Sequence, residues 1–219
     1  MSEPDDDEWT ARSTRIDDFR CDTVFAVRTA VEFCDEATGH IIQGATVTLP
    51  VPGLPLVEPE YATALDLLDR RETLARHYRR VVDAHAARGR LRQLAGGSPQ
   101  FWLRPAIIAR GTVVSSFLWY DTVPEAAALL QALVDAVGAA DEEVWDDLDQ
   151  GWRVRILRRG DLVHLAEWNW EDADEVPSGF AFDAAVLARE AGTALDRLRA
   201  LHRFLVGELG RDYWSRGGL

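Results

Sequence analysis

Apolar and polar residues alternate most regularly in residues 151–172, and this alternation predicts a β-hairpin. We place its two-residue turn at Arg159 and Gly160, because glycine accepts the positive φ that such turns require. This register pairs apolar residues on one face, Ile156 with Val163 and Val154 with Leu165. The opposite face carries Arg153, Arg155, His164, Trp168 and Trp170. The apolar face should pack on a core, and the mixed face is either solvated or a contact surface.

Further stretches with period two predict two more hairpins. Residues 22–33 and 41–49 form one antiparallel pair, and residues 101–120 form another that turns at Arg110 and Gly111. The second hairpin has this expected register: Ile108 with Val113, Ile107 with Val114, and Trp102 with Trp119. Its proline, Pro105, indicates an edge strand or a bulge, because proline donates no ladder hydrogen bond.

Helical periodicity marks the segments between and after these hairpins. Residues 60–94 and 183–209 predict two long helices, and residues 123–137 predict a helix of medium length. Residues 141–149, DEEVWDDLD, predict one short amphipathic helix, and residues 178–182 connect the hairpin of residues 151–172 to the C-terminal helix. The fold class is therefore α+β: a mainly antiparallel sheet built from hairpins, with two long helices and one medium helix packed on it.

The domain organisation follows from changes in composition along the chain. Residues 1–20 contain seven acids and few apolar side chains, which predicts a disordered tail. Residues 21–95 combine a hairpin, a proline-rich extended linker and an arginine-rich helix, and residues 96–219 alternate hairpins with helices. We expect these segments to form one compact domain, because 219 residues suffice for a single large core.

Composition narrows the classes of function. The net charge is −13 and the isoelectric point is about 4.8, which argues against binding of nucleic acid or an anionic membrane. The 24 basic residues are all arginine, as GC-rich coding favours, so a P-loop or Schiff-base lysine is excluded. The start of the chain lacks the pattern of a signal peptide, and no apolar run reaches the length of a membrane helix. We therefore expect a cytoplasmic protein whose cysteines, Cys21 and Cys34, are free thiols.

Motifs for catalysis, metal ions and cofactors are absent from the sequence, so we predict none of the three. The best catalytic candidates are Glu167, Glu171 and Asp172, beside Trp168 and Trp170, since paired carboxylates among indoles suit glycoside hydrolysis. On one strand, however, Glu167 and Glu171 would lie about 13 Å apart, which is too far for a catalytic pair. A carboxylate-dependent hydrolase or a carbohydrate-binding protein is therefore an alternative only.

Two local patterns resemble known families. The hairpin W-x-V-x-I-x-x-x-G-D-x-V-x-L-x-E-W-x-W-E, followed by a helix, resembles immunity proteins of bacterial polymorphic-toxin systems over residues 101–214. That resemblance implies a small, acidic, non-enzymatic protein that blocks a toxin by binding it. Residues 24–49 resemble the strand–turn–strand motif of carboxypeptidase-regulatory-like, transthyretin-type modules, which implies a hairpin and leaves open a structural subunit of a phage-like or secretion assembly.

The predicted binding site combines a cluster of acids with large aromatic side chains. Its members are Asp141, Glu142, Glu143, Trp145, Asp146, Asp147, Asp149, Trp168 and Trp170. Such a surface would attract a basic protein, and we expect the partner to be a basic toxin domain. An ordinary solvated helix explains the acids equally well. The arginines between residues 70 and 92 predict a solvated face, with an anion site as the sharper alternative.

Overall fold

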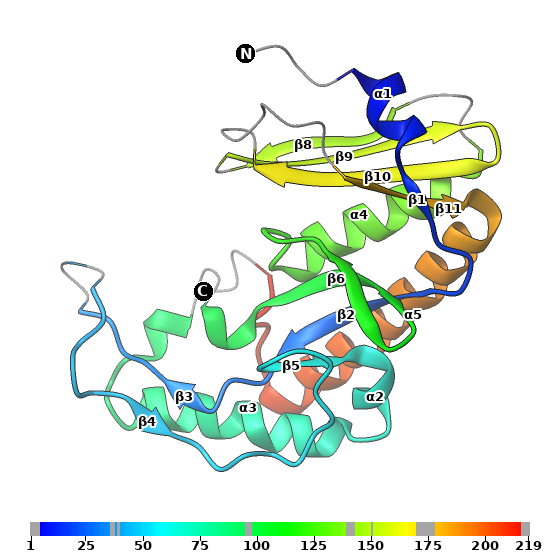
Figure 1. Ribbon diagram of the computed structural model, residues 1–219. Helices are drawn as coiled ribbons and strands as arrows, with labels where there is room; N and C mark the ends of the chain where they lie inside the picture. The colour runs from blue at the N-terminus through cyan, green and yellow to red at the C-terminus, as the bar shows by residue number, and fades with distance from the viewer. Residues whose placement is uncertain are drawn as a thin grey trace.

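The computed structural model has an α+β fold and describes residues 5–35, 38, 40–94, 98–138, 143–149, 151–169 and 178–215. Its larger sheet has five strands in the order β1-β11-β10-β9-β8, and all neighbours are antiparallel except β1 and β11 (Figure 1). The bounds of these strands are β1 Thr14–Arg15, β8 Glu143–Asp149, β9 Trp152–Arg159, β10 Leu162–Asn169 and β11 Gly179–Asp183.

The second sheet has four antiparallel strands in the order β5-β2-β6-β7, and a small two-stranded sheet pairs β3 with β4. Their bounds are β2 Arg20–Ala26, β3 Ala30–Val31, β4 Val47–Thr48, β5 Tyr61–Thr63, β6 Leu103–Ala109 and β7 Thr112–Ser116. The pairing of β2 with β6 joins the N-terminal third of the chain to its middle, so the two predicted segments 21–95 and 96–219 share a sheet.

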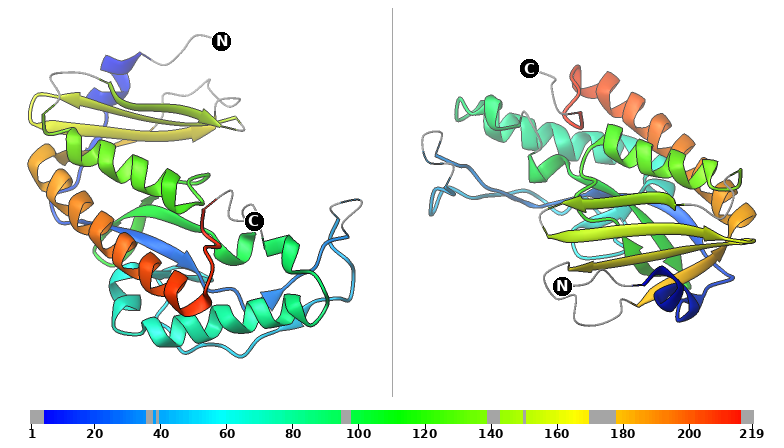
Figure 2. Two further views of the ribbon diagram at one scale, coloured as in Figure 1. Left: turned by 180° about the vertical axis from the view of Figure 1, so that it is seen from behind. Right: turned by 90° about the horizontal axis from the view of Figure 1, so that it is seen from above.

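Helices pack on both sheets. Their bounds are α1 Asp6–Ala11, α2 Ala64–Leu68, α3 Arg71–Ala86, α4 Val123–Asp135 and α5 Ala184–Leu209, with short 3₁₀ turns η1 Leu91–Leu94 and η2 Pro99–Phe101. Helices α4 and α5 lie side by side and contact strands of both sheets, α5 against β2 and β11 and α4 against β6 and β8 (Figures 1 and 2). The main hydrophobic core lies around these two helices.

The predicted helices 123–137 and 183–209 are confirmed, and their ends explain why. Thr122 and Glu125 form a capping box at the start of α4, which satisfies two backbone N–H groups that a helix end leaves unpaired. The Asp183 carboxylate accepts from the Val186 amide at the start of α5, and Gly210, with a φ of 70°, ends that helix.

The predicted hairpin 151–172 corresponds to β9 and β10, with a different register. Gly160 and Asp161 form the turn, so Ile156 pairs with Leu165 instead of Val163. Gly160 has a φ of 58° at the first turn position, where type II′ turns place glycine. The change shifts the pairing by two residues, so the apolar side chains keep their face and the core packing survives.

The predicted turn of the 101–120 hairpin is confirmed at Arg110 and Gly111, both at positive φ. Ile108 pairs with Val113 as expected, but a bulge after Ile107 pairs that residue with Ser115. Trp102 and Trp119 do not pair, because β6 starts after the first and β7 ends before the second. Pro105 lies opposite Thr23 in β6, which is an inner strand of the sheet. Of the two predicted alternatives, the edge strand is therefore wrong, and a bulge is present in β6 after Ile107.

The prediction of a disordered tail over residues 1–20 is wrong for the described part. Asp5 caps α1, whose Trp9 is fully buried on the five-stranded sheet, and β1 joins β11. Acidic composition argued for disorder, but one buried indole and the ion pair of Asp6 with Arg155 hold the helix in place. Both are contacts with residues more than 140 positions away in the sequence.

The predicted strands 22–33 and 41–49 and the helix 60–94 are each broken into shorter elements. Strand β2 ends at Ala26, and β3 pairs with only two residues of the second stretch. Residues 61–63 form β5 on the edge of the second sheet before α2 and α3 begin. Thr63 caps α2 and Asp69 ends it, which divides what periodicity predicted as one helix. Residues 179–182, which were predicted only as a connection to the C-terminal helix, lie in strand β11.

Candidate functional site

The acidic segment 141–149 is a strand and not the predicted helix. Residues Glu143–Asp149 form β8, which pairs antiparallel with β9 and lies at one edge of the five-stranded sheet. Trp145 and Asp147 lie opposite Ile156 and Val154, on the face toward the core. The periodicity of Val144, Trp145 and Leu148 was misleading because the partner strand, and not the segment's own pattern, decides the conformation of a short segment.

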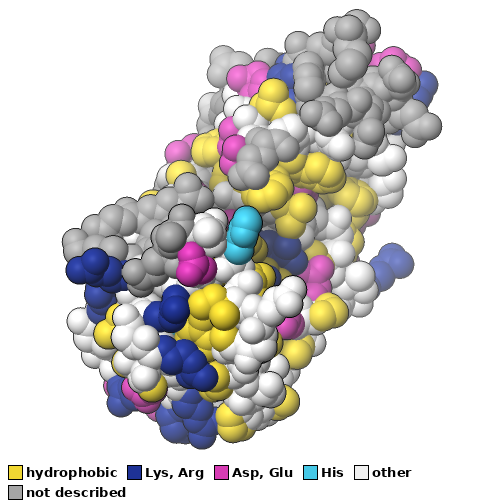
Figure 3. Space-filling model, turned by 90° about the vertical axis from the view of Figure 1, so that its left-hand side faces the viewer, with side chains coloured by type: hydrophobic (Ala, Val, Ile, Leu, Met, Phe, Trp, Pro, Cys, Tyr) yellow, Lys and Arg dark blue, Asp and Glu magenta, His cyan; other side chains and the backbone are white. Residues whose placement is uncertain are grey.

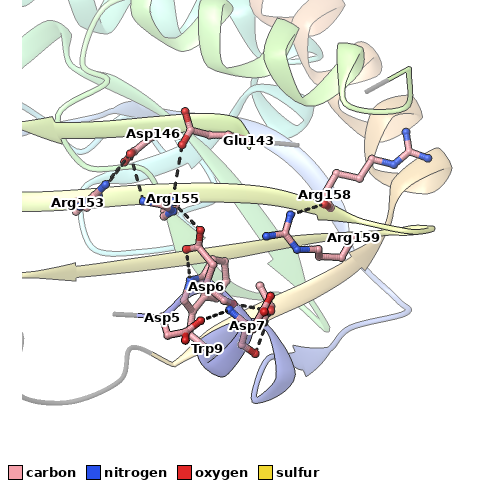
Figure 4. Close-up of polar contacts among 11 residues, drawn as sticks. Asp5, Asp6, Asp7, Trp9, Glu143, Asp146, Arg153, Arg155, Arg158 and Arg159 are labelled. Atoms are coloured by element: carbon pink, nitrogen blue, oxygen red, sulfur yellow. Dashed lines mark hydrogen bonds and ion pairs between the residues drawn. The ribbon is translucent and has the colours of Figure 1, made fainter. Parts of the chain in front are cut away.

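Two arginines of β9 form an ion-pair network with the acids of β8 on the outer face of this sheet (Figure 4). The Arg153 guanidinium donates to both carboxylate oxygens of Asp146, at 2.8 and 2.6 Å. Arg155 lies 3.4 Å from Asp146 and 3.8 Å from Glu143. Asp146 is therefore largely neutralised within the protein, and it is a poor candidate for attracting a partner.

Helix α1 completes this network on the outer face of the five-stranded sheet. The Arg155 guanidinium donates to the Asp6 carboxylate at 2.7 Å, and the indole N–H of Trp9 donates to the other Asp6 oxygen at 3.1 Å (Figure 4). Trp9 packs with Leu157 and Trp168, and Trp168 is only 8% exposed. This indole is therefore covered by the chain's own N-terminal helix and exposes little surface to a partner.

The core side of β8 holds a second polar group. The Tyr120 hydroxyl donates to Asp147 at 2.8 Å and accepts from the indole N–H of Trp145 at 2.6 Å. Burial raises the pKa of Tyr120, and the hydrogen bond to the Asp147 carboxylate adds to this effect. Trp145 is half-buried against the core, so Trp145 and Asp147 attach the loop before α4 to the edge strand.

Besides Asp146, the exposed residues of this edge are Glu143, Leu148 and Asp149. The side chain of Glu143 is 54% exposed and Leu148 is 50% exposed. The nearby loop carries Trp119, which is 38% exposed and has a φ of 75°. Bulky residues rarely adopt this left-handed conformation, and backbone strain of this kind is frequent at functional sites. The sequence held no signal for Trp119, because strain depends on how the loop is closed.

Figure 3 shows how charge and apolar surface are distributed on the face that lies to the left in Figure 1. Arginine side chains gather on its lower half, where α3 lies, and hydrophobic side chains form a band above them. Of the nine predicted binding residues, Glu143, Asp146 and Asp149 are exposed on the same edge strand, and Asp146 is the one that Arg153 binds with two hydrogen bonds. Asp141, Glu142 and Trp170 lie outside the described residues.

Glu167, the catalytic candidate, lies between the two sheets. Ser115 of β7 donates to one of its carboxylate oxygens, and the indole N–H of Trp152 lies 3.5 Å from the other. Burial raises the pKa of Glu167, although these two hydrogen bonds and the charge of Arg104 act in the opposite direction. The carboxyl lines a cavity of about 250 Å³ together with Trp152 and Phe180. The two other candidates, Glu171 and Asp172, lie outside the described residues.

The described residues contain no group of three or more His, Cys, Asp or Glu side chains that could hold a metal ion. Cys21 is buried, Cys34 is half-buried, and both are free thiols. No helix in the described ranges is long and apolar enough to span a membrane. No family model, no curated protein and no solved structure matches this chain.

Proposed function

We propose that this chain is an intracellular protein-binding inhibitor, an immunity protein that binds a basic toxin domain through the exposed edge of β8. The observation that carries the proposal is the composition of that edge: Glu143 and Asp149 are exposed beside the exposed Leu148. A sheet edge offers backbone groups to a partner, while acids on it discourage pairing with a second acidic copy of the same chain.

The overall charge supports a basic partner. With a net charge of −13, the chain attracts basic proteins over distances longer than a contact, which raises association rates at low salt. The acids that contribute at the edge are Glu143 and Asp149, since Asp146 is paired with Arg153 and Arg155. Trp119, which is exposed on the adjacent loop, would supply the apolar anchor that tryptophan often provides in interfaces.

The test begins with the gene beside the one that encodes this chain. We expect it to encode a large secreted protein that ends in a toxin domain, and co-expression of this chain should rescue cells from that domain. Reversal of both edge charges, Glu143→Arg with Asp149→Arg, should slow association about tenfold at low salt and less at high salt. Trp119→Ala should instead speed dissociation, by about tenfold.

A matched control reverses two exposed acids elsewhere. Asp69→Arg with Asp83→Arg makes the same change in net charge on α2 and α3, far from β8 in the sequence. If the control pair slows association as much as the edge pair, total charge and not the edge directs binding. If the toxin-domain gene is missing or the chain gives no rescue, the immunity role is wrong.

A second candidate rests on Glu167. A buried carboxyl with a raised pKa, beside Trp152 in a cavity between two sheets, is the arrangement that a general acid of a glycoside hydrolase requires. Release of reducing sugar from a panel of oligosaccharides, lost in Glu167→Gln, would support this function. Hydrolysis that persists in Glu167→Gln, or no hydrolysis by the wild type, would exclude Glu167 from such a role.

A further inference from the structure

The half of the molecule away from β8 contains its own cavity, which the proposed function does not use. It has a volume of about 320 Å³ and lies where the β3–β4 arm meets the end of α3 and the η1 and η2 turns, at the lower left of Figure 1. The polar side chains that line it include Arg28, Glu32, Glu60, His85 and Gln100. Its volume is at the lower end of the range for small-molecule sites.

His85 contributes a hydrogen-bond acceptor to this cavity. Its Nδ1 atom lies 3.3 Å from the Arg90 carbonyl oxygen, and since a carbonyl can only accept, the ring hydrogen belongs on Nδ1. Nε2 then carries a lone pair, and it has no hydrogen-bond partner in the described structure. The residue is only 2% exposed, and burial lowers the pKa of the ring, which keeps it neutral at pH 7.

Gln100 contributes a second acceptor. Its side-chain NH₂ group donates to the Ala30 carbonyl at 2.8 Å, which fixes the orientation of the amide. The amide oxygen Oε1 has no partner among the described residues, and the residue is 6% exposed. Buried polar atoms are nearly always paired, and two of the residues that line this cavity each carry an unpaired acceptor, which indicates a ligand that brings hydrogen-bond donors.

The charges around the cavity favour a positive ligand. Glu32 and Glu60 line it, and the Nε atom of the one lining arginine, Arg28, lies 3.5 Å from the Glu60 carboxylate without a hydrogen bond, while its guanidinium lies over the Trp102 ring, 5.3 Å from the centroid. Helix α3 ends at Ala86, next to His85, and the C-terminal end of a helix carries a partial negative charge. Glu60 has a φ of 65°, a strained conformation for a residue other than glycine.

Neighbouring arginines outside the cavity lining are engaged elsewhere. Arg88 lies over the Phe33 ring at 4.5 Å, and Arg90 donates to the Cys34 carbonyl at 2.5 Å. They neutralise part of the helix-end charge, and neither residue lines the cavity. The cavity should therefore favour a positively charged ligand with hydrogen-bond donors. Its acceptors belong to His85 and Gln100, and its carboxylates belong to Glu32 and Glu60.

We propose that this cavity binds a small organic cation that carries N–H donors, an amine or a guanidine. The N–H groups would donate to His85 Nε2 and Gln100 Oε1, and the Glu60 carboxylate would compensate the positive charge. This site is separate from the β8 edge, so its tests do not depend on a protein partner.

Isothermal titration calorimetry with matched small molecules tests the proposal. L-arginine and L-citrulline have nearly the same shape, but only the arginine side chain is charged. We expect arginine to bind at least tenfold more tightly than citrulline, putrescine to bind as well, and inorganic phosphate to show no binding. Equal affinity for arginine and citrulline, no binding of either cation at millimolar concentration, or binding of phosphate instead would overturn the proposal.

Variants test which atoms are involved. His85→Asn keeps an N–H near the position of Nδ1 and removes Nε2, so arginine affinity should fall about tenfold or more. His77→Asn is the matched control: His77 is equally buried on the same helix but does not line the cavity, and affinity should stay unchanged. Glu60→Gln, at a position whose side chain is 49% exposed, should also weaken arginine binding without lowering the melting temperature. Wild-type affinity in both His85→Asn and Glu60→Gln would exclude this site.

Discussion

The two halves of this protein use the same residue type, arginine, in opposite ways. In the five-stranded sheet, the side chains of Arg153 and Arg155 are only 11% and 14% exposed and bind several acids from β8 and α1. On α3, the side chains of Arg71 and Arg79 are 50% and 54% exposed, and each pairs with a single acid. The first set is largely buried and shared among several acids, whereas each arginine of the second set is half-exposed and has one acid as its partner.

This difference shows that the charge of a segment says little about its role until its neighbours are known. The acids of β8 suggested a free negative surface, but Asp146 is occupied by two arginines. The arginines of α3 predicted a solvated face and left an anion site open, and in the structure Arg79 binds Glu208 on α5 while Arg71 lies over the Phe204 ring at 4.7 Å. We therefore expect substitutions in the two halves to change the free energy of unfolding by different amounts. We also expect buried titratable groups in the two halves to make stability depend on pH in opposite directions.

The largest expected effect comes from the cover of the five-stranded sheet. Trp9→Ala should lower the free energy of unfolding by about 3–5 kcal/mol, because it removes a fully buried indole and uncovers Leu157 and Trp168. Urea denaturation measures this value. Trp119→Ala, at a 38% exposed position, is the control and should cost less than about 1 kcal/mol. Equal effects would mean that α1 does not dock in solution.

The next effect concerns pH, and the two halves should respond in opposite directions. Burial lowers the pKa of His77 on α3 from 6.5 to about 4. Below pH 6.5 the unfolded chain binds a proton that the folded chain rejects, so stability is present above that pH and lost as pH falls toward 4. We expect a loss of about 2–3 kcal/mol between pH 7 and pH 4, which His77→Leu should abolish.

Glu167, in the sheet half, provides the opposite sign. Burial raises its pKa, so the folded state binds a proton more tightly than the unfolded chain does. The associated stability is present below about pH 4.5 and lost as pH rises through the folded pKa. Urea denaturation of Glu167→Gln at several pH values should show a smaller fall of stability with rising pH than the wild type. An identical fall in both proteins would contradict this assignment.

The ion-pair network around Arg155 should contribute less to the free energy of unfolding than the buried indole of Trp9 does. Arg155→Met keeps much of the side-chain volume but leaves Asp6 and Glu143 without their shared partner, and should cost about 1–3 kcal/mol. A double-mutant cycle with Asp6→Ala isolates the contact between β9 and α1. A coupling energy near zero would show that Trp9 alone holds the helix.

The smallest effect is expected on α3. Arg79→Met removes a pair whose two side chains are 54% and 48% exposed, and should change the free energy of unfolding by less than about 1 kcal/mol. This substitution is the matched control for Arg155→Met, because residue types and volumes are the same. A cost as large as that of Arg155→Met would remove the distinction between the two halves.

The sequence by itself determined the parts of the fold that depend on local signals. Helices α4 and α5 were predicted because their caps and their period of 3.6 lie in the same short stretch. The β6–β7 turn was predicted because Gly111 marks it, and the face of β9 and β10 was right even where the register was wrong by two residues. A shift by two leaves every side chain on its face, so alternation cannot detect it.

Only the tertiary structure decided the elements that depend on distant partners. Residues 143–149 form a strand because β9 supplies the hydrogen bonds and the arginines that their acids need. The N-terminal residues form α1 because Trp9 and Asp6 find Leu157 and Arg155, about 150 positions later in the chain. The burial of Trp168, the strain at Trp119 and the unpaired acceptors of His85 and Gln100 arise in the same way. Each depends on which segments meet in space, and a local pattern of apolar and polar residues does not contain that information.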